Sequence, residues 1–144
     1  MTATRRRRKG SALVEFALVS PVLLLLLAGV LNYASALRTA TSVANAARLG
    51  AEYAGLGPAN SSDTAGIQSA AINSTPGVTG LAVTSARTCQ CPGGTPVNCT
   101  GSCPGGKMLV YVRVTARATA ASIFTYTGLG FSGATSSQAT VWVQ

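Results

Sequence analysis

Apolar residues dominate the first third of the chain, after a short basic stretch. From Ser11 to Leu31 the sequence is almost entirely apolar, and Glu15 is its single charged residue. As a helix, these roughly 21 residues would extend about 31 Å, which is enough to cross the hydrocarbon layer of a membrane. The pattern therefore predicts a transmembrane helix over residues 11–36, preceded by a basic leader at residues 1–10.

The residues that follow change to an amphipathic pattern. Small and apolar residues recur at three- and four-residue spacing, on a stripe made of Val43, Ala46, Ala47, Gly50, Tyr53 and Ala54. Asn45, Arg48 and Glu52 lie largely opposite, and the last two have the spacing of an i,i+4 ion pair. We expect the helix to continue over residues 37–57 and to end at the Gly55-Leu56-Gly57-Pro58 segment. Its small-residue stripe would let another element approach closely.

Residues 58–144 have the pattern of a β-rich extracytoplasmic domain. Ser61-Ser62-Asp63 offers an N-cap for a short helix from Asp63 to Asn73, with Ile67, Ala70 and Ala71 on its inner side. Strand signals follow at Gly80–Thr88, Lys107–Thr119 and about Ala134–Val143, with a looser stretch at Ser122–Phe131.

The middle strand has the clearest alternation. Met108, Val110, Val112 and Val114 fall on one face, and Arg113, Thr115 and Arg117 on the other. The expected fold is α+β, with the long helix covering an antiparallel sheet of three to four strands.

All four cysteines lie in the Gly/Pro-rich segment 89–103. The C-x-C and C-x3-C spacings differ from common zinc sites, and the outside of a bacterial membrane is oxidising, so disulfides are favoured over a metal. A Cys89–Cys91 bridge would close a very tight ring. Among the three possible pairings we expect the nested set, Cys89–Cys103 and Cys91–Cys99, which places partners nearly opposite in a hairpin. The bridges would staple a loop without a core of its own, or shape a surface contact or adhesive tip.

The positive charge is concentrated ahead of the apolar run. Five of the eleven basic residues are Arg5, Arg6, Arg7, Arg8 and Lys9, and without residues 1–10 the formal charge falls from +8 to about +3. By the positive-inside rule, this block keeps the N-terminus cytoplasmic and sends the rest outside. An orientation signal is therefore a better interpretation than a nucleic-acid patch, and we expect no nucleic acid partner.

The chain has few of the residue types that catalysis usually requires. The chain contains no His, and the region beyond the apolar run holds only two carboxylates, Glu52 and Asp63. General acid/base or metal chemistry usually recruits His or clustered carboxylates. We expect no enzyme activity, no metal, no cofactor and no small-molecule substrate.

Glu15 needs a reason, because a charge near a bilayer centre costs roughly 2.5–3.5 kcal/mol on insertion scales. The simplest account is that Glu15 lies near the interface and snorkels into an ion pair with Arg8 or Lys9. Pro21, in the same run, is compatible with a mild kink whose freed carbonyl is satisfied locally, or with a bend that fits subunit packing.

The N-terminal residues also resemble a known family. Arg8-Lys9-Gly10 followed by Ser11-Ala-Leu-Val-Glu15-Phe16 resembles a type IV prepilin leader, and the stretch through Pro21 is similar to the TadE-like pseudopilins of tight-adherence (Flp) pilus systems. The segment Asn45–Ala54 resembles their Ala-Ala-Arg-x-Gly-x-x-Tyr-Ala pattern. The resemblance implies a pilin-like fold and cleavage between Gly10 and Ser11 by a membrane prepilin peptidase, which leaves Glu15 as the fifth mature residue.

The resemblance further implies a minor subunit. Phe16 stands where the major Flp pilins carry Tyr, and those short pilins lack a folded outer domain. We expect a single-pass protein of the bacterial inner membrane that helps initiate or extend a Flp pilus and is itself incorporated or stays at the base. Its partners would be the peptidase, other pilins and inner-membrane assembly proteins.

Cleavage after Gly10 would remove the five leader cations and create an α-amino group on Ser11, one helical turn from Glu15. In a low-dielectric setting that amine, or the amine of a neighbouring subunit, would pair with the carboxylate. Glu15 would then fix the register between subunits or helices.

Two other fates are compatible with the sequence. Ordinary signal peptidase would cut after Ala36, at the Ala34-Ser35-Ala36 site, and release a secreted binding or adhesive protein. Alternatively, the chain stays uncleaved as a membrane-anchored surface protein, similar to the longer TadG-like relatives. The N-terminal residue of the mature protein distinguishes the three.

Overall fold

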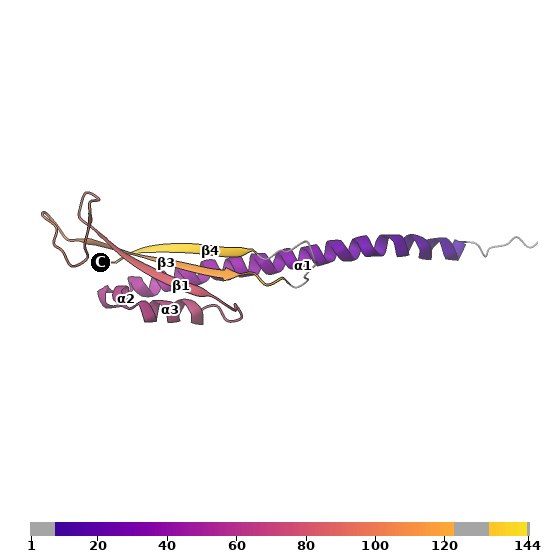
Figure 1. Ribbon diagram of the computed structural model, residues 1–144, viewed down its shortest axis with the longest axis horizontal. Helices are drawn as coiled ribbons and strands as arrows, with labels where there is room; N and C mark the ends of the chain where they lie inside the picture. The colour runs from indigo at the N-terminus through magenta and orange to yellow at the C-terminus, as the bar shows by residue number, and fades with distance from the viewer. Residues whose placement is uncertain (1–7, 123–132, 144) are drawn as a thin grey trace, which may run out of the picture.

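A single long helix organises the molecule. The computed structural model describes residues 8–122 and 133–143, with side chains described from residue 12. Helix α1 (Arg8–Gly55) runs unbroken for 48 residues, through both the apolar and the amphipathic segment. Its first half projects as a rod, while its second half lies along the strands (Figure 1).

The strands form one antiparallel sheet in the order β2-β1-β3-β4, where β1 is Ala82–Gln90, β2 Pro96–Val97, β3 Leu109–Thr119 and β4 Ala134–Val143. Strand β3 is central, and its Val114 lies opposite Ser85 of β1 and Ala139 of β4. The layout confirms the predicted α+β fold with a small sheet beside a long helix.

The core lies between α1 and one face of the sheet. Small and branched residues of α1 are buried against residues of β3, and four further residues complete the core. The α1 residues are Val43, Ala46, Ala47, Ala51 and Ala54, the β3 residues are Val112, Val114, Ala116 and Ala118, and the others are Ile67, Ala71, Val83 and Val143. The close approach depends on glycines of α1. A Cβ at Gly50 would lie 3.1 Å from Val114 Cγ1, and one at Gly55 would lie 2.9 Å from Val141 Cγ2. The predicted small-residue stripe is therefore confirmed as the packing face.

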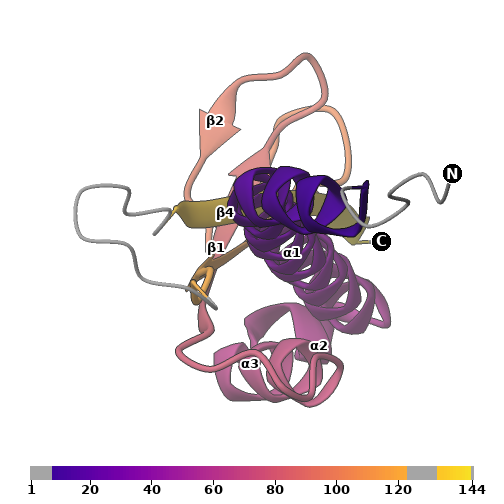
Figure 2. The same ribbon diagram turned by 90° about the vertical axis from the view of Figure 1, so that its right-hand side faces the viewer.

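Two short helices extend this core. Helix α2 (Pro58–Ser62) follows directly on the end of α1, and α3 (Thr64–Asn73) packs beside α1, as the view along α1 shows (Figure 2). Asp63 is the N-cap of α3, since its Oδ1 accepts from the Gly66 N–H at 2.9 Å. The capped helix was predicted, whereas α2 was not. Of the looser stretch 122–131, only Ser122 falls within the described residues.

Candidate assembly site on the N-terminal helix

The first half of α1 exposes its large apolar side chains on all sides. Phe16 is 67% exposed and Leu24 65%, and the same holds for the valines and leucines between them. An apolar surface of this size requires a cover in a folded protein, because patches beyond a few hundred Å² mark interaction sites. The helix is long and apolar enough to cross a membrane. It is thus a candidate membrane anchor.

Pro21 lies inside this half of α1 and cannot donate the usual hydrogen bond to Ala17. The Ser20 hydroxyl donates to the Ala17 carbonyl oxygen at 3.5 Å instead. The freed carbonyl is therefore satisfied within the helix, as expected for proline in a membrane segment.

The predicted cleavage residues lie at the start of α1. The Gly10–Ser11 bond falls in its first turn, and Glu15 follows one turn later with an exposed side chain. Helical geometry therefore puts an amine created on Ser11 on the same face as Glu15. Arg8 and Lys9 belong to the same turn, whereas Arg5, Arg6 and Arg7 lie outside the described residues.

A comparison with known protein families finds a match to this part of the chain. Residues 10–52 match the family model described as TadE-like protein. This segment is TadE-like. The matched segment covers the exposed apolar half of α1 and most of the half that packs on the sheet. The TadE-like family is associated with Tad/Flp pilus systems. No curated protein and no solved structure matches the chain.

Within the TadE-like segment, the charged pair opposite the packing face is also confirmed. Arg48 Nε donates to Glu52 Oε1 at 2.8 Å, with both side chains largely exposed. Such an exposed i,i+4 pair contributes little, about 0.3–0.5 kcal/mol. The packing of this half of α1 on the sheet therefore depends on its small residues rather than on this ion pair.

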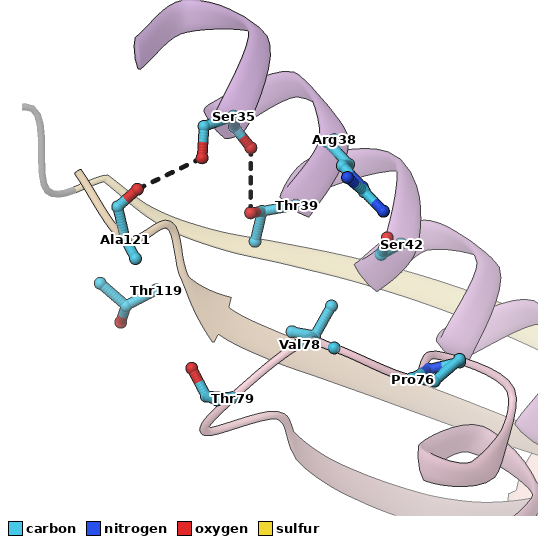
Figure 3. A pocket seen from close by; sticks show the side chains of 10 residues that line it. Ser35, Arg38, Thr39, Ser42, Pro76, Val78, Thr79, Thr119 and Ala121 are labelled. Atoms are coloured by element: carbon cyan, nitrogen blue, oxygen red, sulfur yellow. Dashed lines mark hydrogen bonds between the residues drawn. The ribbon is translucent and has the colours of Figure 1, made fainter. Parts of the chain in front are cut away.

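A polar cleft of about 330 Å³ opens where the rod joins the domain (Figure 3). Ser35, Arg38, Thr39 and Ser42 of the TadE-like segment form one wall, and residues 76–79, Thr119 and Ala121 form the others. The Ser35 hydroxyl donates to the Ala121 carbonyl oxygen at 3.3 Å, so this contact ties the end of the apolar half to the sheet. The sequence analysis did not predict the cleft, although the hydroxyl residues at positions 35, 39 and 42 recur at helical spacing and could have indicated a polar face on α1.

A second polar cluster fixes the far end of α1. Tyr53 donates its hydroxyl hydrogen to Asp63 Oδ2 at 2.9 Å, while Asp63 Oδ1 caps α3. The backbone N–H of Gly66 and the Tyr53 hydroxyl hold the pKa of Asp63 below its usual range. The hydrogen bond to Asp63, with some desolvation, raises the pKa of Tyr53. The sequence predicted Tyr53 on the packing stripe and Asp63 at the helix N-cap, but it did not predict the hydrogen bond between them.

The cysteines form two disulfides, but the predicted nested pairing is wrong. Cys89 is bonded to Cys99 and Cys91 to Cys103, with Cα–Cα distances of 5.2 and 5.4 Å. The cause is an early turn. The Cys91 N–H donates to the Thr95 carbonyl at 2.9 Å, and β2 then pairs with the end of β1. Cys99 therefore returns beside Cys89, and Cys103 folds back to the turn.

Proposed function

We propose that this protein is a minor pseudopilin that acts in the assembly or initiation of a Tad/Flp pilus. The observation that carries the proposal is the TadE-like match over residues 10–52, on a helix whose first half is exposed and apolar and whose second half packs under a sheet. The exposed half would lie in the inner membrane and later pack among other pilin helices. The sheet domain would lie outside.

The disulfides support this orientation. Disulfides persist in oxidising compartments, and all four cysteines are bridged. With the basic block on the other side of the apolar segment, the N-terminus would be cytoplasmic.

Prepilin peptidase would mature the protein by cutting after Gly10. Arg8 and Lys9 belong to the first described turn of α1, which contains no acidic residue. Cleavage would remove both cations together with the rest of the leader. It would leave the Ser11 amine one turn from Glu15, as a partner for that carboxylate.

The structure argues against release after Ala36 as the main fate. A cut there would sever α1 in mid-helix, remove the buried Asn32, and break the contact of Ser35 with Ala121. We also propose a structural rather than an enzymatic role, because the two carboxylates of the outer domain serve structural contacts. Glu52 pairs with Arg48, and Asp63 caps α3.

The test is the N-terminal sequence of the protein recovered from membranes of a host that carries the Tad system. We expect Ser11. Gly10→Val should block the cut, because a side chain there hinders the close approach of a protease to the backbone. The matched control is Gly29→Val, at a position where an added Cβ meets nothing within 4 Å. An N-terminus at Leu37, or at Met1 or Thr2, would contradict the proposal in favour of the secreted or the uncleaved form.

A further inference from the structure

The sheet has a second face that points away from the core. Because side chains alternate along a strand, Val112, Val114 and Ala116 point to the core while Arg113, Thr115 and Arg117 point outward. On the neighbouring strands the outward positions are exposed: Ala82, Thr84, Ala86 and Thr88 of β1, and Ala134, Ser136, Gln138, Thr140 and Trp142 of β4. We call these outward residues of β1, β3 and β4 the outer face.

The outer face carries an aromatic pair at one end. Tyr111 lies directly opposite Trp142 in the register, and Trp142 is 48% exposed. A cavity of about 270 Å³ opens beside Trp142 and is lined by Lys107, Met108 and Leu109. Trp142 is exposed and Tyr111 beside it is half-buried, so the pair offers an apolar surface on which a planar or ring-shaped ligand can stack.

The charges of this face have one sign. Arg113 and Arg117 are exposed on β3, and Lys107 lies at the aromatic end. All three acidic residues of the chain, Glu15, Glu52 and Asp63, lie on α1 or at the cap of α3. The outer face therefore carries Arg and Lys side chains but no Asp or Glu side chain, which favours an anionic ligand.

Neutral hydrogen-bonding groups separate the cations. Four residues of strand place Arg113 and Arg117 about 14 Å apart, with Thr115 between them. Thr84 and Gln138 flank Thr115 in the register. Hydroxyl and amide groups both donate and accept hydrogen bonds, as sugar hydroxyls require.

We propose that the outer face binds an anionic polysaccharide. Sugar rings stack on Tyr111 and Trp142, and carboxylate groups of the polymer pair with Arg113 and Arg117, in the fork geometry that guanidinium groups favour. A nucleic acid fits less well, because it is usually held by a continuous basic groove, whereas Arg113 and Arg117 are about 14 Å apart with neutral residues between them. The binding requires only that this face is exposed, whichever role the helix has in the envelope.

The experiment uses the full-length protein in a nonionic detergent. Trp142 is the only tryptophan, so its fluorescence reports ligand at the face directly. We expect polygalacturonate to change this fluorescence in a saturable, salt-sensitive way, and neutral dextran to leave it unchanged. Arg113→Gln and Arg117→Gln should each weaken binding about tenfold, the effect of losing one charge-assisted contact. Arg48→Gln removes the same charge from the opposite side of the molecule and should have no effect.

Trp142→Ala, measured by affinity electrophoresis in a polygalacturonate gel, should also abolish most of the retardation. Gln138→Ala is a milder second variant at an exposed position and should weaken binding without any risk to the fold. The proposal is overturned if polygalacturonate does not bind, if Arg48→Gln weakens binding as much as Arg113→Gln, or if an oligothymidine binds as tightly as polygalacturonate.

Discussion

At the scale of single residues, Gly66 shows how the C-terminal end of α1 is joined to the start of α3. A Cβ at this position would collide with Asp63 Oδ2 and the Tyr53 hydroxyl, and would lie 2.7 Å from Tyr53 Cε1. The bare backbone of Gly66 thus makes room for the ring of Tyr53. It also supplies the N–H that the Asp63 carboxylate accepts. One missing side chain lets α1 and α3 share a hydrogen-bonded cluster.

Gly66→Ala should therefore destabilise the outer domain by about 1 kcal/mol, at the low end of the cost of overpacking, because the atoms that the new Cβ meets belong to side chains that can move. Urea unfolding of the full-length protein in nonionic detergent, followed by Trp142 fluorescence, measures the change. Gly133→Ala is the matched control, because a Cβ there meets nothing within 4 Å. Equal stabilities of the two variants would show that the Tyr53 ring adjusts freely.

The same cluster predicts a pH dependence. The pKa of Asp63 is lowered by the Gly66 N–H first and by the Tyr53 hydroxyl second. A lowered pKa in the folded state means that the ionised form stabilises the fold at neutral pH. This stability is lost as the pH falls below about 4 and through the folded pKa. Asp63→Asn keeps an acceptor for the cap and removes the titration.

The melting temperature of the wild type should therefore fall more steeply between pH 6 and pH 3 than that of Asp63→Asn. Glu52→Gln should follow the wild type, because the exposed Glu52–Arg48 pair contributes little. If the Asp63→Asn and wild-type curves run parallel, the cluster does not control the acid transition.

At the scale of elements, the sequence predicted those with strong periodicity. The stripe around Ala47 and Gly50 identified the packing face of α1, and the alternation around Val112 identified the central strand. The short elements were missed. Helix α2 and strand β2 contain five and two residues, too few for a period to appear.

The wrong disulfide pairing has the same origin as the missed strand β2. The segment Pro92-Gly93-Gly94 is a turn signal, and both glycines have a positive φ, at 104° and 86°. Treating residues 89–103 as one wide hairpin overlooked this turn. Since the turn fixes which cysteine returns beside Cys89, the pairing could not be derived from spacing alone.

The interleaved pairing makes a specific prediction. Replacing Cys89 and Cys99 together by Ser should leave Cys91–Cys103 intact and no free thiol, at a cost of about 3 kcal/mol for one closed loop. Replacing Cys89 and Cys103 breaks both bridges and should expose the two remaining thiols. Thiol titration of the two double variants distinguishes them. The reverse result would restore the nested pairing.

At the scale of the whole molecule, one helix links two environments. The exposed half of α1 is suited to lipid or to a bundle of similar helices, and the other half forms the core of the folded domain with the sheet. The unbroken helix and the Ser35–Ala121 contact join the two parts. A change in how the apolar halves pack would thus be transmitted to the position of the outer domain.

Glu15 is the residue on which this packing should depend. In the proposed mature protein, its carboxylate pairs with a Ser11 amine within a low-dielectric bundle. Glu15→Val would leave that amine without a partner, at a cost of about 3–5 kcal/mol for each broken pair. We expect normal membrane insertion and an N-terminus at Ser11, but a strong loss of pili in the sheared surface fraction and in electron micrographs.

Glu15→Gln separates charge from polarity in this experiment, because it keeps the shape and a hydrogen-bonding group while removing the negative charge. If the ion pair sets the register, this variant also fails to assemble pili. Leu18→Val, a small change at an exposed apolar position one turn away, should assemble them normally. Unchanged piliation with Glu15→Val would eliminate the register role. Loss of the Ser11 terminus in the same variant would instead move the role of Glu15 to recognition by the peptidase. Because insertion, cleavage and assembly are measured separately on one set of variants, the step at which the carboxylate acts can be assigned.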